Sequence, residues 1–357
     1  MNLWLKVLLT FLSTLLAVVL VLVGEIPRDP FVGSDYYLRM HGRLDSLEQN
    51  WHLKATSDSL RVGWSRTALI PDRPVPMAGY GARDPKEFDG ITDTVYVRTI
   101  VLDDGEDRVA WLSADLLVIH PEVAQAFFEK ASDLGWERGQ LYLSATHTHA
   151  SIGAWAPGLV GKLFAGPYDP SIVEFVANRM LQSLTLAESQ LQSGSFAYGE
   201  LKVPELIKNR LVKERGTTDP WLKVIGLTSG EDQAYASVYA AHATSLSHHH
   251  RALSGGFPGS YNRHVVSSTE ATFSLYAAGA VGSMGPRVAP AATELLETDH
   301  FAMQLSENVA LLELLDPPYQ EQVTLAAFRL PLDLPDPMMK INRSHGLRTW
   351  LFERLTG

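Results

Sequence analysis

The chain opens with an apolar run that has no polar face. Residues 7–24 carry no charged side chain, and a helix of this length rises about 27 Å, close to the hydrocarbon thickness of a bilayer. The run therefore predicts a transmembrane helix, because a core helix of a soluble domain would show a polar face. A cleaved signal peptide is the alternative. It would favour a shorter apolar run and small residues at its cleavage site, whereas this run ends in LVLVGEIP.

The pattern divides the chain into three segments. Residues 1–30 are expected to be the membrane anchor, with the positive charge that precedes the apolar run on the inner side and the remainder extracytoplasmic, either periplasmic or outer. Residues 31–60 contain apolar residues near helical spacing between 36 and 53, which predicts a juxtamembrane helix and linker. Residues 61–357 are expected to form one domain, because no clear linker interrupts them before residue 316.

Strand-like and helix-like patterns alternate irregularly in the third segment. Apolar runs of strand length occupy 94–102, 108–119, 140–146, 221–228 and 234–243, and residues 272–282 are either a strand or a buried segment. Helical spacing occupies 121–136, 170–191 and 294–315. Because the connections include both short turns and crossovers, the expected fold class is α/β, with mixed β-sheets flanked by helices and preceded by one N-terminal transmembrane helix.

Composition excludes several classes of protein. The formal net charge is −10 and no basic cluster is evident, which argues against a nucleic-acid partner. The chain has no cysteine, so disulfides, thiolate metal sites and cysteine nucleophiles are excluded. The compartment is not fixed by this absence, because exported proteins can also lack cysteine.

Histidines follow two of the predicted strands. His147 and His149 lie in SATHTHA, where a spacing of two would place both side chains on one face of a strand. This arrangement is a common way to present two nitrogens to one zinc ion, although alone it is a weak signal. His242 follows a second apolar strand and precedes a Gly/Pro-rich loop, a position where sites are commonly built. A metal or catalytic site is one interpretation. Surface histidines, or a core histidine bonded to a backbone carbonyl, are the alternatives.

Two further features are weaker candidates. The run His248–His250 lies in the loop itself, and adjacent loop residues rarely converge on one ion. Asp115 closes the strand RVAWLSAD. Its carboxylate either orients a ligand histidine or caps the turn that follows.

Five segments together resemble the amino-terminal catalytic domain of the neutral/alkaline, non-lysosomal ceramidase family. They are PMAGYGARDPKEFDGITDTVYVRTIVL (76–102), SADLLVIHPEV (113–123), LSATHTHASIGAW (143–155), HATSLSHHHRALSGGFPG (242–259) and YAAGAVGSMGP (276–286). The resemblance covers roughly residues 62–316, and the order of SATHTH with the later histidine segment makes it specific. The anchor and short loops look more like the small bacterial members.

The resemblance implies a zinc-dependent amidohydrolase that acts on a lipid-like amide. It implies that His147 and His242 are zinc ligands and that His149 lies beside the metal and contacts the substrate. An Asn-Arg pair contributes an arginine to the site in this family, which points to Arg210, preceded here by Asn209.

The sequence also departs from the family. Gly279 stands where these enzymes carry a serine, and Ser283 stands at the acidic position that follows. The family's glutamate and tyrosine ligands come from a later segment that we expect beyond Gly357, so the 357-residue chain is expected to bind zinc weakly. Four residues of the last predicted helix are possible substitutes: Glu294, Glu297, Asp299 and His300. A second Asn-Arg pair, Asn342 and Arg343, lies outside the matching region.

Two other functions remain open on the sequence. One is a membrane-tethered binding or scaffold protein that keeps the fold without turnover. The other is the same zinc chemistry on another amide or on an ester.

Overall fold

The structure, a computed structural model, describes residues 2–26, 31–50, 59–83, 86–314, 318–333, 340–342 and 344–356. The chain divides into two compact units. The first unit comprises Met1–His52, Pro157–Val160 and Leu330–Gly357, and the second comprises Leu53–Ala156 and Gly161–Arg329. The division into 1–30, 31–60 and 61–357 stays a prediction.

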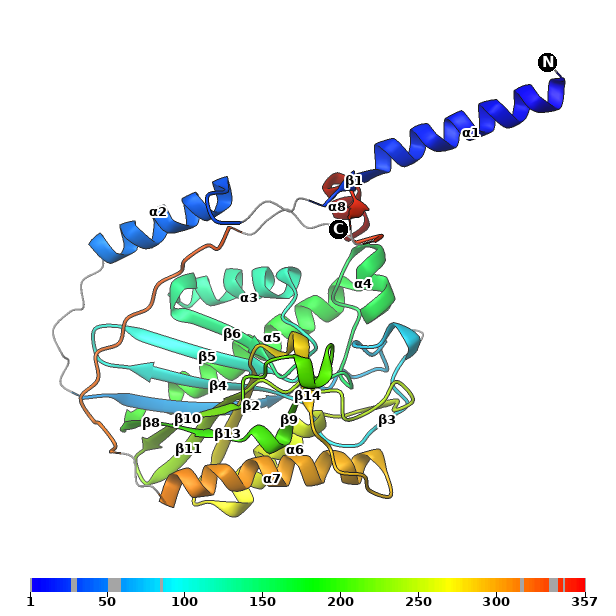
Figure 1. Cartoon of the computed structure of the whole chain (residues 1–357). Helices are drawn as coiled ribbons and strands as arrows, with labels where there is room; N and C mark the ends of the chain where they lie inside the picture. The colour runs from blue at the N-terminus through cyan, green and yellow to red at the C-terminus, as the bar shows by residue number, and fades with distance from the viewer. Residues whose placement is uncertain are drawn as a thin grey trace. The chain divides into compact units, whose positions relative to one another are not determined.

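Two β-sheets form the centre of the second unit (Figure 1). A five-stranded sheet has the order β6-β5-β4-β2-β7 and a four-stranded sheet has the order β13-β11-β10-β8. Their strands are β2 (Arg61–Ala68), β4 (Tyr96–Asp103), β5 (Arg108–Ala114), β6 (Leu141–Ala145), β7 (Gln192–Ser193), β8 (Phe196–Lys202), β10 (Trp221–Ser229), β11 (Asp232–Tyr239) and β13 (Phe273–Ala278). The pairs β5–β6 and β11–β13 are parallel and the other pairs are antiparallel.

Apolar side chains from both sheets pack against one another. Val62 and Ile100 of the larger sheet share one buried cluster with Leu227, Phe273 and Leu275 of the smaller sheet. Burying a side chain of this size contributes about 1.5–3 kcal/mol. The sheets therefore face each other as the two inner layers of a sandwich.

Helices cover the outer face of each sheet, which completes four layers (Figure 1). The larger sheet is covered by α5 (Pro170–Ser189), which packs against α3 (Pro121–Asp133). The smaller sheet is covered by α6 (Gly256–Ser268) and α7 (Glu294–Leu314). In α5, Val176, Met180 and Leu184 recur at helical spacing and are fully buried, so this helix turns one apolar face to the sheet.

Short elements tie the loops of the second unit together. The strand β3 (Gly90–Ile91) pairs with β12 (Ala252–Leu253), and β9 (Ile207–Asn209) pairs with β14 (Met284–Pro286). The helix α4 (Gly158–Ala165) lies between β6 and α5 in the sequence.

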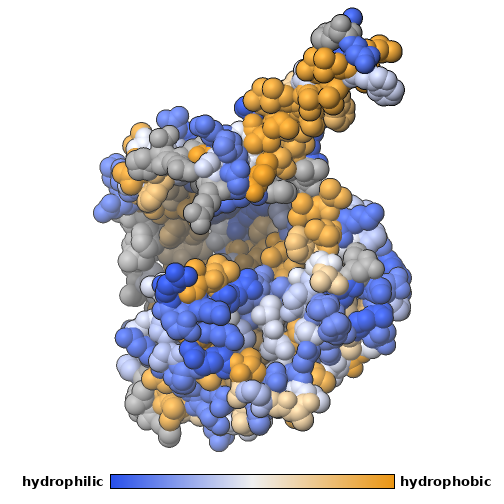
Figure 2. Space-filling model, turned by 45° about the vertical axis from the view of Figure 1, so that its right-hand side comes forward, coloured by the Kyte–Doolittle hydropathy of each residue, from blue (hydrophilic) through white to orange (hydrophobic). Residues whose placement is uncertain are grey.

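The first unit contains α1 (Leu3–Leu22), α2 (Asp35–Asn50), α8 (Thr349–Thr356) and the strand pair β1 (Val23–Glu25) and β15 (His345–Leu347). Within the described residues, α1 alone is long and apolar enough to cross a membrane, a test that a signal sequence also passes. Figure 2 shows apolar side chains along its length. The helix α2 matches the predicted juxtamembrane helix up to residue 50, and residues 51–53 of that prediction lie outside the described part.

The predicted fold class is confirmed, because the structure is mixed α/β with helices outside the sheets. Among the longer strands, β2 and β8 were not predicted, and the first residues of α6, which include the sequence GFPG, fall in the Gly/Pro-rich segment that was expected to be a loop. Pro258 lies in the first turn of α6, where backbone N–H groups have no acceptor within the helix, so proline there costs no helical hydrogen bond. The turn-like composition therefore marks the start of a helix.

Candidate metal centre

His147 and His149 lie in the loop after β6. The expectation that the two share one face of a strand is wrong, because β6 ends at Ala145. His147 has a φ of +62°, in the left-handed region that non-glycine residues rarely adopt. Such a conformation costs on the order of 1–3 kcal/mol and persists only when the surroundings enforce it. The loop turns sharply at His147, so the following residues do not continue along the strand direction.

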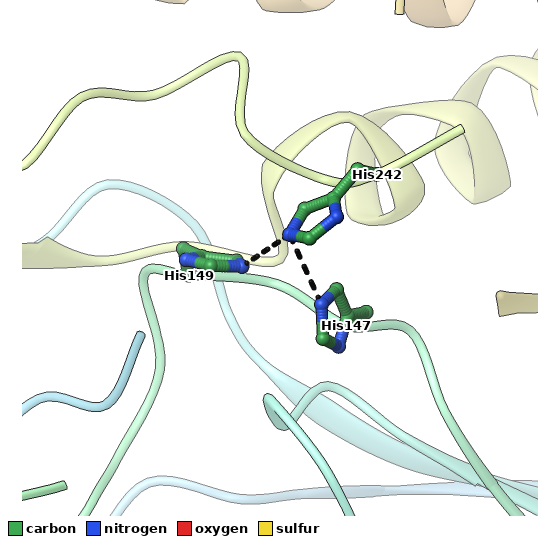
Figure 3. Close-up of side chains that lie close together, drawn as sticks. All are labelled: His147, His149 and His242. Carbon is green, nitrogen blue, oxygen red and sulfur yellow. Dashed lines mark hydrogen bonds between the residues drawn. The ribbon is translucent and has the colours of Figure 1, made fainter. Parts of the chain in front are cut away.

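Three imidazole rings converge at the ends of strands from both sheets. His242 lies in the segment after β11, and its Nε2 atom is 3.1 Å from Nε2 of His147 and 2.9 Å from Nε2 of His149 (Figure 3). One ligand atom from each ring lies within 4.8 Å of the other two. This trio of His147, His149 and His242 is the only such group of possible metal ligands in the part of the chain that the structure describes.

Backbone carbonyls fix the tautomer of two of these rings. Nδ1 of His147 donates to the carbonyl of Leu117 at 2.7 Å, and Nδ1 of His242 donates to the carbonyl of Val281 at 3.2 Å. A neutral ring with its proton on Nδ1 has a bare lone pair on Nε2. The two Nε2 atoms therefore face each other with no proton between them, which is unfavourable unless a cation lies nearby.

Burial keeps the three rings neutral. It lowers the pKa of His149 to about 3 and that of His242 to about 4, and the neighbouring rings would add repulsion if they were charged. The pKa of His147 is also lowered, chiefly by burial and further by the charge of Arg210. Neutral imidazoles are the form that binds metal ions.

The spacing of these nitrogens fits a transition-metal ion. Zinc–nitrogen bonds of about 2.0–2.1 Å in a tetrahedral site place two ligand nitrogens roughly 3.3 Å apart. The separations of 2.9 and 3.1 Å at His242 are close to this value. Two neutral, carbonyl-oriented imidazoles with free Nε2 lone pairs are a donor set that suits zinc.

A loop that the sequence analysis did not single out packs against His149. Gly79 has a φ of +122°, and a Cβ atom there would lie 2.8 Å from Cα of His149. The ring of Tyr80 lies 4.6 Å from the ring of His149, and Arg83 donates to the carbonyl of His149 at 2.8 Å. These residues belong to the segment GYGAR of the family resemblance, which was the available signal for them.

Arg210 borders the trio. Its backbone N–H donates to the carbonyl of Ser283, and its Nε atom donates to the carbonyl of Gly282 at 3.1 Å. Its charge lowers the pKa values of both His147 and His242 after the larger effect of burial. Arg210 is exposed to solvent.

Asp115 makes its described hydrogen bonds away from the histidines. Its side chain is fully buried, and Oδ2 accepts from the backbone N–H of Tyr96 and from Nη1 of Arg98, each at 2.8 Å. The orienting partners of His147 and His242 are instead the backbone carbonyls of Leu117 and Val281. Asp115 thus anchors the end of β5 through a buried ion pair.

The possible substitute ligands on α7 do not join the trio. Glu294 accepts from the backbone of Ser247, and Glu297 accepts from that of Ala291. Asp299 accepts from Ser260 and from His264.

The remaining candidates also lie outside the trio. They are His300, His248, His249 and His250. The backbone N–H of Gly279 donates to Tyr239. Arg343 lies outside the described residues, so the pair that it forms with Asn342 has no described geometry.

Comparisons of sequence and of structure both relate this chain to neutral ceramidases. The model of the neutral/alkaline non-lysosomal ceramidase N-terminal domain matches residues 71–285. A crystal structure of neutral ceramidase from Pseudomonas aeruginosa aligns with a TM-score of 0.65 at 19% identity, over 75% of this chain and 46% of that chain. A ceramidase complexed with C2 aligns with the same score and identity, over 75% of this chain and 45% of that one. The chain thus spans less than half the length of these two structures, and at this identity the likeness shows the fold.

Proposed function

Because the chain belongs to the neutral/alkaline non-lysosomal ceramidase family, whose model matches more than half of its length, we propose that it is a zinc-dependent hydrolase of a lipid-like amide. The observation that carries the proposal is the trio, in which the Nε2 lone pairs of His147 and His242 face each other. Family membership supports amide cleavage, and the neutral rings support a metal ion.

His147 and His242 hold the ion in this proposal, through the Nε2 atoms that their carbonyl-bonded tautomers leave free. Zinc, when bound, supplies a Lewis acid for the amide carbonyl and lowers the pKa of a bound water to about 7. Arg210 donates hydrogen bonds to the carbonyl oxygen of the substrate as negative charge develops on it. Such a donor contributes about 3–4 kcal/mol in other hydrolases.

His149 contacts the substrate in this proposal. Its Nδ1 atom makes no hydrogen bond of ordinary geometry to a described residue, and hydrogen bonding to the backbone of Gly79 is the smallest of the effects on its pKa. The Nδ1 atoms of His147 and His242, by contrast, each donate to a carbonyl, as the ligand histidines of metal sites nearly always do. The ring of His149 is instead placed by contacts with Gly79 and Tyr80. It can therefore hydrogen-bond a polar group of the substrate beside the ion.

The metal assignment is tested by elemental analysis of purified variants. We expect His147→Ala and His242→Ala each to lose zinc and to lose hydrolysis of a fluorogenic short-chain ceramide. His249→Ala is the matched control, because His249 lies outside the trio, and it should keep both. Full zinc in the first two variants would sink the assignment, and a zinc-free wild-type protein would favour a scaffold.

The role of His149 is tested separately by the variant His149→Ala. We expect this variant to keep its zinc and to lose turnover by roughly 100-fold or more, the scale of one lost polar contact in a transition state. Elemental analysis and steady-state kinetics on the same preparation check this expectation. Loss of the zinc together with activity would show that His149 is a third ligand.

We further propose that α1 anchors the protein in a membrane and that the catalytic unit lies on the extracytoplasmic side. The length and apolar composition of α1 support the anchor. An anchored enzyme would meet a lipid substrate at the surface of the bilayer.

A further inference from the structure

A loop next to the trio displays two apolar side chains to solvent. Leu211 is 68% exposed and Val212 is 47% exposed. The buried side chain of Asn209 holds the loop, because its Oδ1 atom accepts from the backbone N–H groups of Leu211 and Val212 at 3.1 and 3.0 Å. Its Nδ2 atom donates to the carbonyl of Thr217 at 3.0 Å. The outward position of the two side chains is thus built into the loop.

The charge of this loop is opposite to that of the whole chain. Residues 208–215, with the sequence KNRLVKER, contain four basic residues and one acidic residue, while the formal net charge of the chain is −10. All four basic residues are exposed: Lys208, Arg210, Lys213 and Arg215. Exposed apolar side chains flanked by basic ones are typical of segments that sit at the interface of an anionic membrane.

Other exposed apolar side chains lie on segments near the trio. Val118 is 40% exposed and follows Leu117, whose carbonyl accepts from His147. Phe164 is 44% exposed, and its carbonyl accepts from Gly79, which packs against His149. With the loop 208–215, they place exposed apolar groups on three separate segments that border the trio.

We propose that the loop 208–215 docks on an anionic lipid surface and brings the trio to the headgroup region. The occupant is a bilayer because exposed basic residues flank the apolar side chains, as in segments at the interface of an anionic membrane, and because the same chain carries α1, a helix long and apolar enough to cross a membrane. The inference rests on the proposed function in one respect, because a lipid-like substrate gives the docking its purpose. The proposal also explains why Asn209 is buried next to Arg210. The side chain of Asn209 shapes the loop, and that of Arg210 contacts the substrate.

The experiment uses the absence of cysteine from the chain. A single cysteine in the full chain, introduced as Leu211→Cys, is labelled with the fluorophore NBD and reconstituted into vesicles of phosphatidylcholine and phosphatidylglycerol. Leu186→Cys is the matched control. Leu186 is also an exposed leucine (40%). It lies near Glu188, which pairs with Arg108 at the start of β5. This is the end of the sheet away from Asp115.

We expect the label at position 211 to shift to the blue and to be quenched by doxyl-labelled lipid, while the label at position 186 stays water-like. Equal behaviour of the two labels, or a blue shift at 211 without lipid quenching, would overturn the proposal. The second outcome would indicate a contact with another copy of the chain. Vesicles of phosphatidylcholine alone should give less quenching at 211.

Charge reversal tests the electrostatic part. One basic residue contributes about 1 kcal/mol near an anionic surface, so Lys213→Glu and Arg215→Glu should each reduce the insertion equilibrium of the label at 211 by roughly fivefold or more. Unchanged quenching would contradict the proposal. The same labels in a His147→Ala background separate the two ideas, because docking should persist there even though hydrolysis is lost. Loss of docking in an active enzyme would refute only the docking.

Discussion

At the scale of single residues, the space around His149 depends on Gly79. This glycine adopts a φ of +122° and approaches the backbone of His149 so closely that a Cβ atom would overlap it. His149 therefore packs against a position where any residue larger than glycine would overlap it. A substitution at Gly79 acts on the trio without touching any of its three nitrogen atoms.

We expect Gly79→Ala to keep its zinc and to lower the turnover of a fluorogenic short-chain ceramide by roughly tenfold or more, because the added Cβ displaces His149 from the position in which it contacts the substrate. Steady-state kinetics and elemental analysis on the same preparation check this expectation. Gly105→Ala is the control, because Gly105 also has a positive φ but has nothing within 4 Å of the added Cβ. The variant Gly105→Ala bears only the backbone cost, about 1 kcal/mol. An equal loss of turnover in both variants would contradict the steric explanation.

The candidate residues could be found from the sequence where they follow a recognisable strand. His147, His149 and His242 are brought together because the strands before them end at neighbouring edges of two packed sheets. The orienting carbonyls of Leu117 and Val281 could not be found, because any residue type supplies a carbonyl. The positive φ of His147 was equally invisible, since histidine does not signal it.

At the scale of elements, the role of α1 can be tested by deleting it. Deleting residues 1–26 should convert a protein that resists carbonate extraction from membranes into one found in the supernatant, because α1 supplies the continuous apolar length. Mass spectrometry of the intact protein is the control. A mature amino terminus near Glu25 would reject the anchor in favour of a signal peptide.

The elements with regular periodicity were the predictable ones. Helices α3, α5 and α7 follow their apolar spacing to within a few residues, and so do β4, β6 and β10. The strand β2, which was not predicted, lies between two neighbours in the sheet and alternates less clearly, with Arg61 and Arg66 at exposed positions. Long-range pairing, which no local pattern reveals, makes this segment a strand.

At the scale of the whole second unit, stability depends on the layer between the sheets. Phe273 is buried there and stacks on Trp64, with ring centroids 6.1 Å apart. We expect Phe273→Ala to lower the free energy of unfolding by about 3–5 kcal/mol, because it leaves a cavity between the sheets. Leu186→Ala, at an exposed position on α5, should change it by about 0.5 kcal/mol or less. Urea denaturation of both variants checks the difference.

The trio draws on both layers of the sandwich, since His147 and His149 follow β6 of one sheet and His242 follows β11 of the other. An ion bound by His147 and His242 would act as a cross-link between two sheets that are otherwise held by non-covalent packing. Such a cross-link forms only after the sheets have docked, so metal capture would be a late step in folding. It would also stabilise the folded state in proportion to the logarithm of the free metal concentration, and a chelator would loosen the sandwich as well as stop the chemistry.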